Sequence, residues 1–558
     1  MMNPAKPWLK NYPEGVPSEI GSLQYRSIPH FLEDRFERYG NRNVVESIGK
    51  FFSYKDLDRL SKDFAAYLHT LDLEKGSRIA LMYPNVIECL VAMIGTLRAG
   101  YVVVNINPLY TARELEGQIN DSGASVLVLM ENFAATYAQI KSMPSIRRVI
   151  VSSPGELLGL KGYIVNWVAR NVKKMIPHWS FPHIAYKEAL RIGSGNKFQK
   201  PEIGLDDVAF LQYTGGTTGI SKGAVLLHRN ILSNLLQIEA WLNPGLKNQK
   251  NDQLVFLCAL PLTHIFALTA CAFLGIAKGG LLLMVANPRD ISGFIKMLMK
   301  HPNINIFPGV NTLFHALIHR PEFKLVKMPN LMITIGGGMA VHKKTADHWQ
   351  AITGVPISQG YGLSETSPVV CVNSPLEKQF TGHIGPPMPS TDVVILDDEG
   401  LEQPLGMAGE ICIKGPQVMA GYWNKPEETA QSMTSDGYFR SGDIGLITSD
   451  GFVQIVDRKK DMIVVAGFKV FPNDVEDVLV QMPGIQECAV IGLPHRKLGE
   501  IVTAFVVRSN HHITEVNVLQ YCKDNLTSYK RPRKVVFVND LPKSNVGKIL
   551  RRELRNIT

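Results

Sequence analysis

The chain has 558 residues, of which 45% are apolar and 20% are charged; this composition is typical of a folded globular protein and excludes a disordered or fibrous one. At this length we expect more than one domain. The net charge of +9 favours anionic partners such as nucleotides or acidic lipid, whereas the sequence has no zinc-finger or basic-helix pattern that would indicate nucleic acid.

The cysteines and the apolar stretches predict a cytoplasmic protein. The seven cysteines are odd in number and form no CxxC motif, which indicates reduced thiols in a reducing compartment. Residues 1–15 lack the continuous apolar segment of a signal peptide. The longest apolar stretch, 265–277, is shorter than the roughly 20 residues that cross a bilayer. We interpret it as a buried helix, followed by a strand at 281–286.

The first part of the chain alternates between helix and strand patterns. Ser53 and Asp56 have the spacing of a helix-capping box, and a run of apolar residues on one helical face follows them. Apolar runs predict strands at 78–82, 102–105, 126–130 and 148–151. Such alternation favours a mainly parallel sheet covered by helices on both faces.

Residues 160–182 differ from the rest of this region. They mix aromatic and aliphatic side chains with Arg170, Lys173 and Lys174. A stretch of this kind can lie on a membrane surface. It can equally form a helix that packs on the domain with its basic side in water, and the sequence leaves both interpretations open.

A stretch rich in glycine and threonine follows the apolar strand pattern at 208–212. It consists of Tyr213, Thr214, Gly215, Gly216, Thr217, Thr218, Gly219, Ile220, Ser221, Lys222, Gly223 and Ala224. Glycines allow backbone amides to turn inward, and together with four hydroxyls and one lysine they suit a polyphosphate ligand. The stretch is not a Walker A loop, because Ser221 stands before Lys222 where that motif has glycine. A polar turn between strands is the alternative, but it would leave these many donors surplus.

Two later segments have features of a nucleotide site. The strand pattern at 333–335 ends in three glycines, 336–338, which let a flat ring approach the backbone closely. In the segment 359–366, Tyr361 offers an aromatic face on which a base can stack. Glu365 offers one carboxylate for Mg²⁺, whose other ligands would be phosphate oxygens and water.

A carboxylate and a charged run mark the end of the large domain. Asp443 follows Gly442 and is suited to accept hydrogen bonds from the two ribose hydroxyls of a nucleotide. Five consecutive charged residues, 457–461, are typical of a solvated linker. We therefore predict an N-terminal domain over 1–457 and a C-terminal domain over 458–558. The expected fold class is α/β, with parallel-rich sheets in the large domain and a small α/β domain after it.

These motifs, in this order, resemble those of the adenylate-forming superfamily, which holds acyl-CoA synthetases, luciferases and adenylation domains of peptide synthetases. The resemblance is strongest to bacterial long-chain fatty-acid–CoA ligases and runs from Trp8 to Arg552. It implies that ATP, with Mg²⁺, activates a long-chain fatty acid to acyl-AMP, and that coenzyme A (CoA) then receives the acyl group. It also implies that the small C-terminal domain is mobile.

The resemblance also implies roles for individual residues. The catalytic residues would be Lys548, near the chain end, with Glu365, the metal ligand, and Thr214. ATP would be bound by 213–219 and 221–224 and by Gly336, Gly337, Gly338, Gln359, Gly360, Tyr361, Gly362, Ser364, Asp443 and Arg458. The fatty-acid pocket would include His264, Phe266, Gly309 and Val310. The tunnel for CoA would be lined by Gly467, Phe468 and Lys469, and the domain hinge would be Lys460.

Some positions depart from the family pattern. Many fatty-acid ligases have glutamate at Gln359, and an aromatic residue is more usual at Thr263. Ser364, Tyr438 and Ser441 are mild replacements for the usual threonine, tryptophan and threonine. At 307–313 a simple strand-to-helix turn is as compatible with the residues as a pocket wall.

Alternative functions remain open at this stage. The chain could load its acyl group onto a carrier protein, or act on medium-chain or aromatic acids. A nucleotide-binding regulator without turnover is a further alternative from a different class. A homodimer and peripheral contact with the cytoplasmic face of the inner membrane also remain open.

Overall fold

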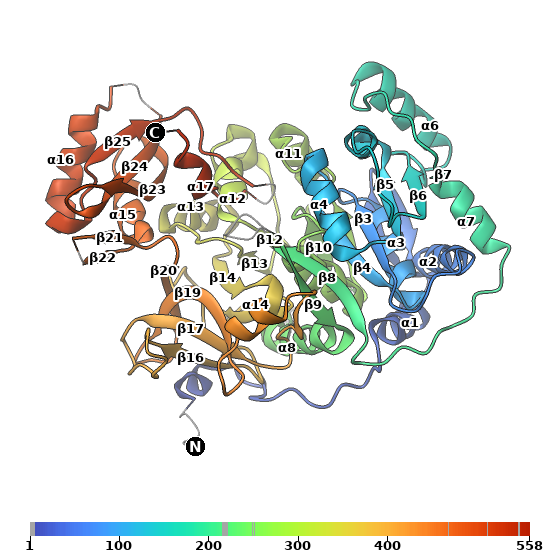
Figure 1. The fold of residues 1–558 in the computed structure, drawn as a ribbon, viewed down its shortest axis with the longest axis horizontal. Coiled ribbons are helices and arrows are strands. Elements are labelled where there is room, and N and C mark those ends of the chain that lie inside the picture. Colours follow the sequence, from blue (N-terminus) through green and yellow to red (C-terminus); the bar gives the residue numbers. More distant parts are fainter. Residues whose placement is uncertain are drawn as a thin grey trace.

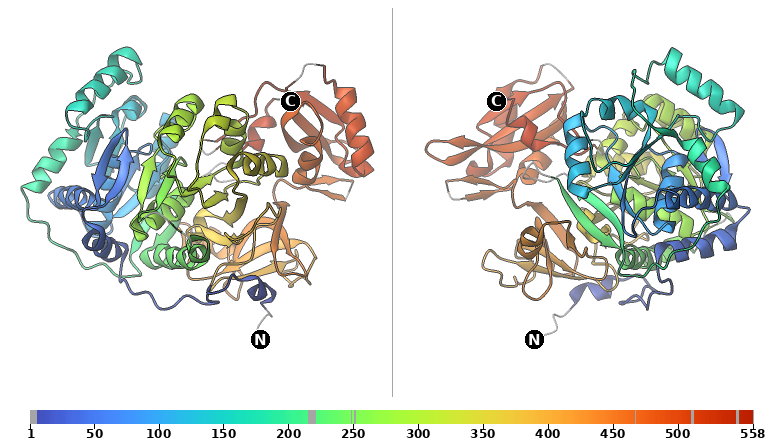
Figure 2. Two further views of the ribbon diagram at one scale, coloured as in Figure 1. Left: turned by 180° about the vertical axis from the view of Figure 1, so that it is seen from behind. Right: turned by 45° about the vertical axis from the view of Figure 1, so that its right-hand side comes forward.

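The computed structural model describes residues 6–214, 221–247, 249, 252–466, 468–509, 512–544 and 547–557. The described chain forms a large N-terminal α/β region and a smaller C-terminal α/β region that stands beside it (Figure 1). In the second view of Figure 2, the C-terminal region projects from the larger body.

One large sheet carries the predicted parallel strands. Its strand order is β18-β9-β8-β4-β3-β5-β6-β7, and all pairs from β8 to β7 are parallel. The bounds are β3 Arg78–Met82, β4 Val102–Ile106, β5 Val126–Met130, β6 Arg148–Ser152, β7 Ile184–Ala185, β8 Val208–Thr214, β9 Lys222–Leu227 and β18 Gly421–Tyr422. The strands predicted at the start of the chain are therefore confirmed to within a residue.

Helices α2 (Tyr54–His69), α3 (Ile87–Arg98), α4 (Ala112–Ser122) and α7 (Tyr186–Ser194) accompany this sheet. The predicted cap of α2 is confirmed. Ser53 Oγ accepts the Asp56 backbone N–H at 3.1 Å, and Asp56 Oδ2 accepts the Ser53 N–H at 3.0 Å. This reciprocal pairing satisfies amides that would otherwise lack partners at a helix start.

A second large sheet lies beside the first. Its strand order is β15-β14-β13-β12-β10-β11-β1-β2. The bounds are β1 Asn43–Ser47, β2 Lys50–Ser53, β10 Val255–Cys258, β11 Leu281–Met284, β12 Ile306–Gly309, β13 Ile333–Gly336, β14 Ile357–Gly362 and β15 Val369–Val372. Its accompanying helices include α1 (Ile28–Tyr39), α8 (His228–Leu246), α11 (Ile291–Lys300), α12 (Asn311–Ile318) and α13 (Lys343–Thr353).

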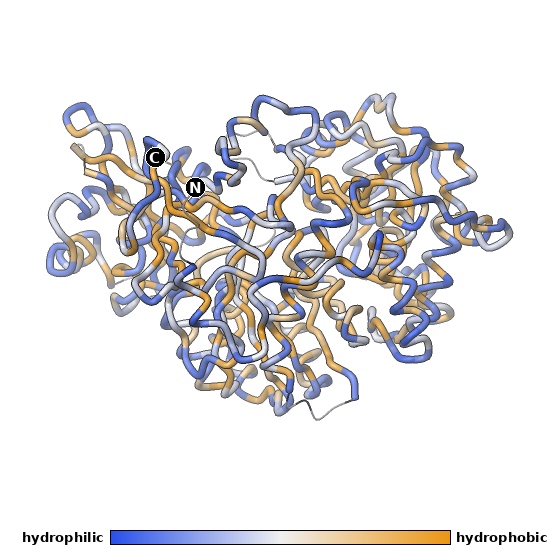
Figure 3. Tube along the Cα trace, turned by 90° about the horizontal axis from the view of Figure 1, so that it is seen from below, coloured by the Kyte–Doolittle hydropathy of each residue, from blue (hydrophilic) through white to orange (hydrophobic). Residues whose placement is uncertain are grey.

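The apolar stretch 265–277 is helical and buried, as predicted, but it is not one regular helix. It comprises α9 (Ile265–Ala267), the π-helical turn η4 (Leu268–Phe273) and α10 (Leu274–Ala277). The apolar cores of the two large sheets are continuous, with side chains such as Phe256 and Trp349 fully buried. In Figure 3 the apolar residues follow the inner strands, and hydrophilic residues dominate the outer loops.

A small antiparallel sheet leads to the C-terminal region. It consists of β16 (Asp392–Leu396), β17 (Gly409–Lys414), β19 (Phe439–Ile447) and β20 (Val453–Arg458). The C-terminal region then contains β21 (Ile463–Val465), β22 (Phe468–Val470), α15 (Pro472–Leu479), β23 (Ile485–His495), β24 (Gly499–Arg508), α16 (Glu515–Asn525), β25 (Lys534–Phe537) and α17 (Arg551–Leu554). Its strands bury apolar side chains of their own on both faces. Across the described residues, no helix combines the length and the apolar character needed to traverse a bilayer.

Candidate active site

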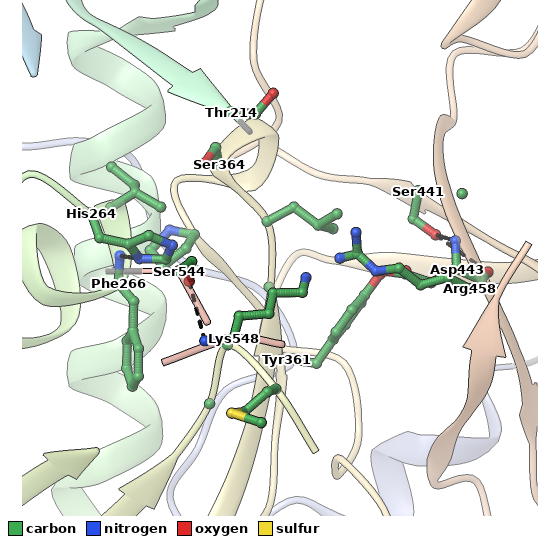
Figure 4. A pocket seen from close by; sticks show the side chains of 18 of the residues that line it. Thr214, His264, Phe266, Tyr361, Ser364, Ser441, Asp443, Arg458, Ser544 and Lys548 are labelled. Carbon is green, nitrogen blue, oxygen red and sulfur yellow. Dashed lines mark hydrogen bonds and ion pairs between the residues drawn. The ribbon is translucent and has the colours of Figure 1, made fainter. Parts of the chain in front are cut away.

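A cavity of about 2000 Å³ brings most of the predicted residues together. Its wall is built from the ends of β8, β13, β14 and β19, the segment around His264, and the loop that carries Lys548. Figure 4 shows these side chains converging from segments that are far apart in the sequence. The cavity is thus shared between the N-terminal and C-terminal regions.

The described ends of the glycine- and threonine-rich stretch belong to two neighbouring strands. β8 and β9 pair antiparallel with Thr214 opposite Lys222, and the connecting residues 215–220 lie outside the described part of the chain. Thr214, Ser221 and Lys222 line the cavity. Gly223 and Ala224, which follow Lys222 in β9, do not line the cavity, so a direct ligand contact for these two has no support in the geometry.

Glu365 is the buried carboxylate of the cavity wall. Tyr422 donates its hydroxyl to Glu365 Oε1 at 2.8 Å, and the Lys222 ammonium lies 5.3 Å from the centre of the Tyr422 ring. Burial raises the pKa of Glu365, an effect that the Tyr422 hydrogen bond opposes. Tyr422 thus holds the acid in place.

A second buried group joins an aromatic ring, a carboxylate and a guanidinium. Tyr361 donates its hydroxyl to Asp443 Oδ2 at 2.7 Å, and Arg458 Nε lies 3.2 Å from Asp443 Oδ1. Ser441 Oγ accepts the Asp443 backbone N–H at 3.1 Å. Asp443 is 4% exposed, so its carboxylate is fixed before any ligand arrives. Ser441 supplies the hydroxyl that the more usual threonine would supply.

The Gln359 departure has a structural explanation. Its Oε1 accepts the Val341 N–H at 3.1 Å, while its Nε2 donates to the His383 carbonyl at 3.3 Å. A glutamate could accept the first of these hydrogen bonds but could not donate the second while ionised. The neutral amide therefore matches its surroundings and keeps the wall beside Gly360 closed.

The predicted glycines divide into two groups. A Cβ added to Gly337 would lie 3.1 Å from the Phe266 ring and 3.2 Å from the Gly360 carbonyl, in the cavity wall itself. Gly338, also in the wall, has φ +74°, which favours glycine. Gly309 and Gly336 lie behind the wall, where a Cβ would meet Phe314 and Val341, each at 2.6 Å. These two serve close packing.

His264 marks the change from a polar to an apolar wall. Its Nδ1 accepts the Phe266 backbone N–H at 3.3 Å, so the neutral ring carries its proton on Nε2. Burial, with the nearby Lys548, lowers the pKa of His264 to about 4. Beyond it, the apolar lining includes Phe266, Val310, Ile238, Trp241, Leu242, Ala270 and Met388. Thr263 also lines the cavity, and its carbonyl accepts Gln212 Nε2 at 2.8 Å.

Lys548 enters the cavity from the C-terminal region. In Figure 4 its side chain lies between His264 on one side and Tyr361 and Arg458 on the other. Burial and the positive charge of Arg458 lower its pKa to about 7, and Asp443 opposes this change. An amine with this pKa at a cavity shared by two regions is a strong candidate for a catalytic group.

The loop before Lys548 docks closely on α12. Gly547 has φ +77°, and a Cβ at that position would lie 2.3 Å from Thr312 Oγ1. Ser544 Oγ accepts the Lys548 backbone N–H at 3.1 Å. His342 Nδ1 also lies 3.8 Å from Asp477 Oδ1 across the two regions. The segment after β12 is therefore a docking surface for the lysine loop as well as a turn.

The charged run 457–461 is only partly a solvated linker. Asp457 is 1% exposed, and burial raises its pKa to about 6 against the influence of Arg551. Arg551 Nη2 lies 2.8 Å from Glu476 Oε1, and its Nη1 lies 3.4 Å from Asp461 Oδ2. Arg551 therefore connects the segment after Lys548 to the charged run. Lys460 lies in the turn between β20 and β21 and lines the cavity. The sequence analysis assigns no role to Arg551, because its burial against carboxylates of distant segments cannot be read from the local sequence.

The predicted CoA segment is away from the cavity. Gly467 lies outside the described residues, and neither Phe468 nor Lys469 lines the cavity. Phe468 stacks on Tyr529 with ring centres 5.0 Å apart, and Lys469 Nζ lies 3.2 Å from Asp398 Oδ2. In this arrangement the C-terminal region presents Lys548 and keeps the other segment outside.

Comparisons with known proteins show what the whole chain is similar to. A profile described as AMP-binding enzyme matches residues 32–423, and one described as AMP-binding enzyme C-terminal domain matches residues 474–548. An Escherichia coli O6:H1 protein named long-chain-fatty-acid–CoA ligase is 46% identical over 99% of this chain and 98% of its own. A Bacillus subtilis protein of the same name is 34% identical over the same shares. The crystal structure of ATP-bound MatB from Rhodopseudomonas palustris is 29% identical and has a TM-score of 0.80, covering 95% of this chain and 98% of that one.

Proposed function

Because the chain belongs to the AMP-binding enzymes, and among them to the long-chain-fatty-acid–CoA ligases, we propose that its cavity performs two successive reactions. A fatty-acid carboxylate oxygen attacks the α-phosphorus of ATP, and pyrophosphate leaves as acyl-AMP forms. The CoA thiolate then attacks the acyl carbon, and AMP leaves as the thioester forms. The observation that carries the proposal is the position of the Lys548 side chain, between His264 with the apolar lining beyond it and the group formed by Tyr361, Asp443 and Arg458.

The first reaction must bring two anions together. The Lys548 ammonium would bridge the carboxylate and the α-phosphate and stabilise the negative charge of the transition state. His264 is neutral and presents Nε2–H, which would orient the carboxylate without competing for the lysine's role. The apolar lining beyond His264 and Phe266 would receive the fatty tail.

The nucleotide would lie on the opposite wall. Asp443 would accept hydrogen bonds from the ribose hydroxyls, and Tyr361 and the glycine wall at 337–338 would flank the base. Arg458, Thr214 and Lys222 would donate to phosphate oxygens, together with backbone amides of the glycine- and threonine-rich stretch. Phosphoryl transfer depends on such positioned charge.

The Glu365 site fits a magnesium ion. Its carboxylate is buried in the wall, and only Oε1 is engaged by Tyr422 in the described contacts. The described residues contain no group of three or more His, Cys, Asp or Glu that could hold a metal, so phosphates and water would complete the coordination. A bound Mg²⁺ would stabilise charge on the departing pyrophosphate.

The second reaction requires another arrangement of the C-terminal domain. Lys548 lies in the cavity, whereas Phe468 and Lys469 lie outside it. One small domain cannot place Lys548 and the segment 467–469 in the cavity at the same time. We place the domain boundary between 457 and 458, and rotation about Lys460 would exchange these two segments. The CoA pantetheine would then enter beside 467–469. Contact with the cytoplasmic face of the inner membrane would supply the lipid-borne acid.

The proposal is tested by separating the two reactions in a Lys548→Ala variant. We expect acyl-AMP formation, measured by ATP–pyrophosphate exchange, to fall by about 10²–10³ or more. Conversion of supplied acyl-AMP to acyl-CoA should be largely preserved. Lys534→Ala, an exposed lysine of the same domain, serves as the control. Equal loss of both reactions would refute the assigned role, and the acid-length profile of CoA-dependent AMP release tests the substrate class.

A further inference from the structure

The helical segment 160–175 has its apolar face on the outside. It comprises α6 (Leu160–Trp167) and the π-helical turn η3 (Val168–Val172), and it projects from the edge of the first large sheet (Figure 1). Its exposed apolar side chains, between 50% and 87% accessible, are Leu160, Tyr163, Ile164, Trp167, Val172 and Met175. The first four fall at helical spacing on one face. A surface helix of a soluble protein normally points such a face inward, so this one is reversed.

Contacts on the inner face of the helix fix its orientation. Gly162 packs on Gly155, where an added Cβ would lie 2.0 Å from the Gly155 carbonyl oxygen. Asn166 accepts the Gly155 N–H at 2.7 Å and donates to Ser153 Oγ at 2.9 Å. Arg170 lies 2.8 Å from the buried Glu131. Small and polar groups therefore fasten the helix, and the apolar face remains directed at solvent.

The charge of the segment identifies its partner. Residues 157–187 contain no aspartate or glutamate, and they include Lys161, Arg170, Lys173, Lys174 and Lys187. Lys173 and Lys174 are exposed at the end of the helix. A second copy of this chain on the same face would bring like charges together, whereas anionic lipid headgroups are complementary to them. Exposed apolar side chains beside basic ones are the pattern of helices that lie in a membrane interface.

We propose that 160–175 docks the protein on an anionic phospholipid surface, with the four apolar side chains of α6 inserted among the lipids and Lys173 and Lys174 at the headgroups. The helix is too short to span a bilayer and lies parallel to its surface. The inference rests on the proposed function, because an enzyme that uses long-chain fatty acids gains from contact with the phase in which they dissolve. It assigns that contact to one defined segment.

Vesicle sedimentation of the full-length protein tests the proposal. We expect binding to vesicles of phosphatidylglycerol and phosphatidylethanolamine, much weaker binding to phosphatidylcholine, and a loss of binding as salt rises from about 0.05 M to about 0.5 M. Leu160→Ser/Ile164→Ser should lower the binding at least about tenfold. Lys173→Glu/Lys174→Glu should lower binding to the anionic vesicles selectively.

Matched variants control for general effects of the substitutions. Leu401→Ser/Leu405→Ser removes two exposed leucines elsewhere, and Lys296→Glu/Lys300→Glu makes the same charge change on α11. Both should bind vesicles like the unaltered protein. Equal binding by all variants would overturn the proposal. So would a change in oligomeric state with Leu160→Ser/Ile164→Ser while vesicle binding stays the same, because the face would then serve a second copy.

Activity assays separate this inference from the proposed function. Leu160→Ser/Ile164→Ser should leave turnover of freely dissolved dodecanoate unchanged and reduce turnover of oleate presented in vesicles. If the unaltered protein binds anionic vesicles through this face but releases no AMP with any acid, the ligase assignment fails and the docking surface stands. If turnover is normal but vesicle binding is absent, the docking surface fails alone.

Discussion

The ammonium group of Lys548 has a pKa of about 7, lowered by burial and by Arg458, and this gives acyl-AMP formation a defined pH dependence. In the proposed first reaction the charged form bridges the two anions, and this form is lost as pH rises through the pKa. We therefore expect kcat/KM for the first reaction to fall about tenfold per pH unit above about pH 7. The kcat should hold to higher pH, because bound anions raise the pKa of the lysine.

Lys548→Arg provides the control for this pH profile, because a guanidinium stays charged throughout the range. The variant should be slower but should lack the alkaline fall in kcat/KM. The same fall in the arginine variant would assign it to another group.

Gly547 offers a test that does not alter the lysine itself. Gly547→Ala adds a Cβ at φ +77° and 2.3 Å from Thr312 Oγ1, so the loop could no longer dock on α12. We expect acyl-AMP formation to fall by about 10² or more, since small displacements of a catalytic group are costly. Gly406→Ala is a matched control, with φ +84° and open space around it. It should leave both reactions near normal, and a similar loss there would point to general destabilisation.

Among the elements, α8 supplies part of the apolar wall of the cavity, and the N-terminal segment packs against Trp241 of this helix. Trp241 of α8 lines the cavity, donates its indole N–H to the Asn373 carbonyl at 3.2 Å and meets Tyr12 edge-on at 5.1 Å between ring centres. Tyr12 in turn donates to the Pro387 carbonyl at 2.6 Å. Trp241→Leu should shift the preferred acid to longer chains by about two methylene groups, because the smaller side chain leaves about that volume empty in a close-packed wall.

The acid-length profile of AMP release measures this shift. Trp349→Leu is the control, because Trp349 is equally buried but does not line the cavity. Both variants should lower Tm, and only the first should alter the profile. An unchanged profile in Trp241→Leu would mean that the acyl chain ends elsewhere.

The elements also show what sequence alone could predict. Strands such as Arg78–Met82 and the cap at Ser53 are specified by local patterns, so they were predicted well. The roles of Tyr422 and Trp241 depend on contacts between distant segments, which no local pattern encodes. Likewise, the charged run 457–461 suggested solvent, whereas Asp457 is buried against Arg551, almost a hundred residues later.

At the scale of the whole molecule, the two proposed reactions need two positions of the C-terminal domain. Lys460→Pro would fix φ in the turn between β20 and β21. It removes none of the hydrogen bonds found in that turn, which are donated by the N–H groups of 459, 461 and 462. We expect acyl-AMP formation to persist and thioester formation to fall at least about tenfold. Lys460→Ala should retain both, and normal overall turnover in the proline variant would exclude a hinge at this position.

The carboxylate of Asp443 has a consequence for nucleotide choice. Both of its oxygens are held in place, one by the Tyr361 hydroxyl and the other by Arg458, in a site that is almost closed to solvent. Each carboxylate oxygen can accept a second hydrogen bond, which a ribose hydroxyl would supply in the proposed complex. A sugar that lacks its 2′-hydroxyl would offer one donor fewer in this nearly closed site, and a site that binds a hydroxyl in this way discriminates against the analogue without it. We therefore expect ATP to support acyl-AMP formation much better than 2′-deoxy-ATP does.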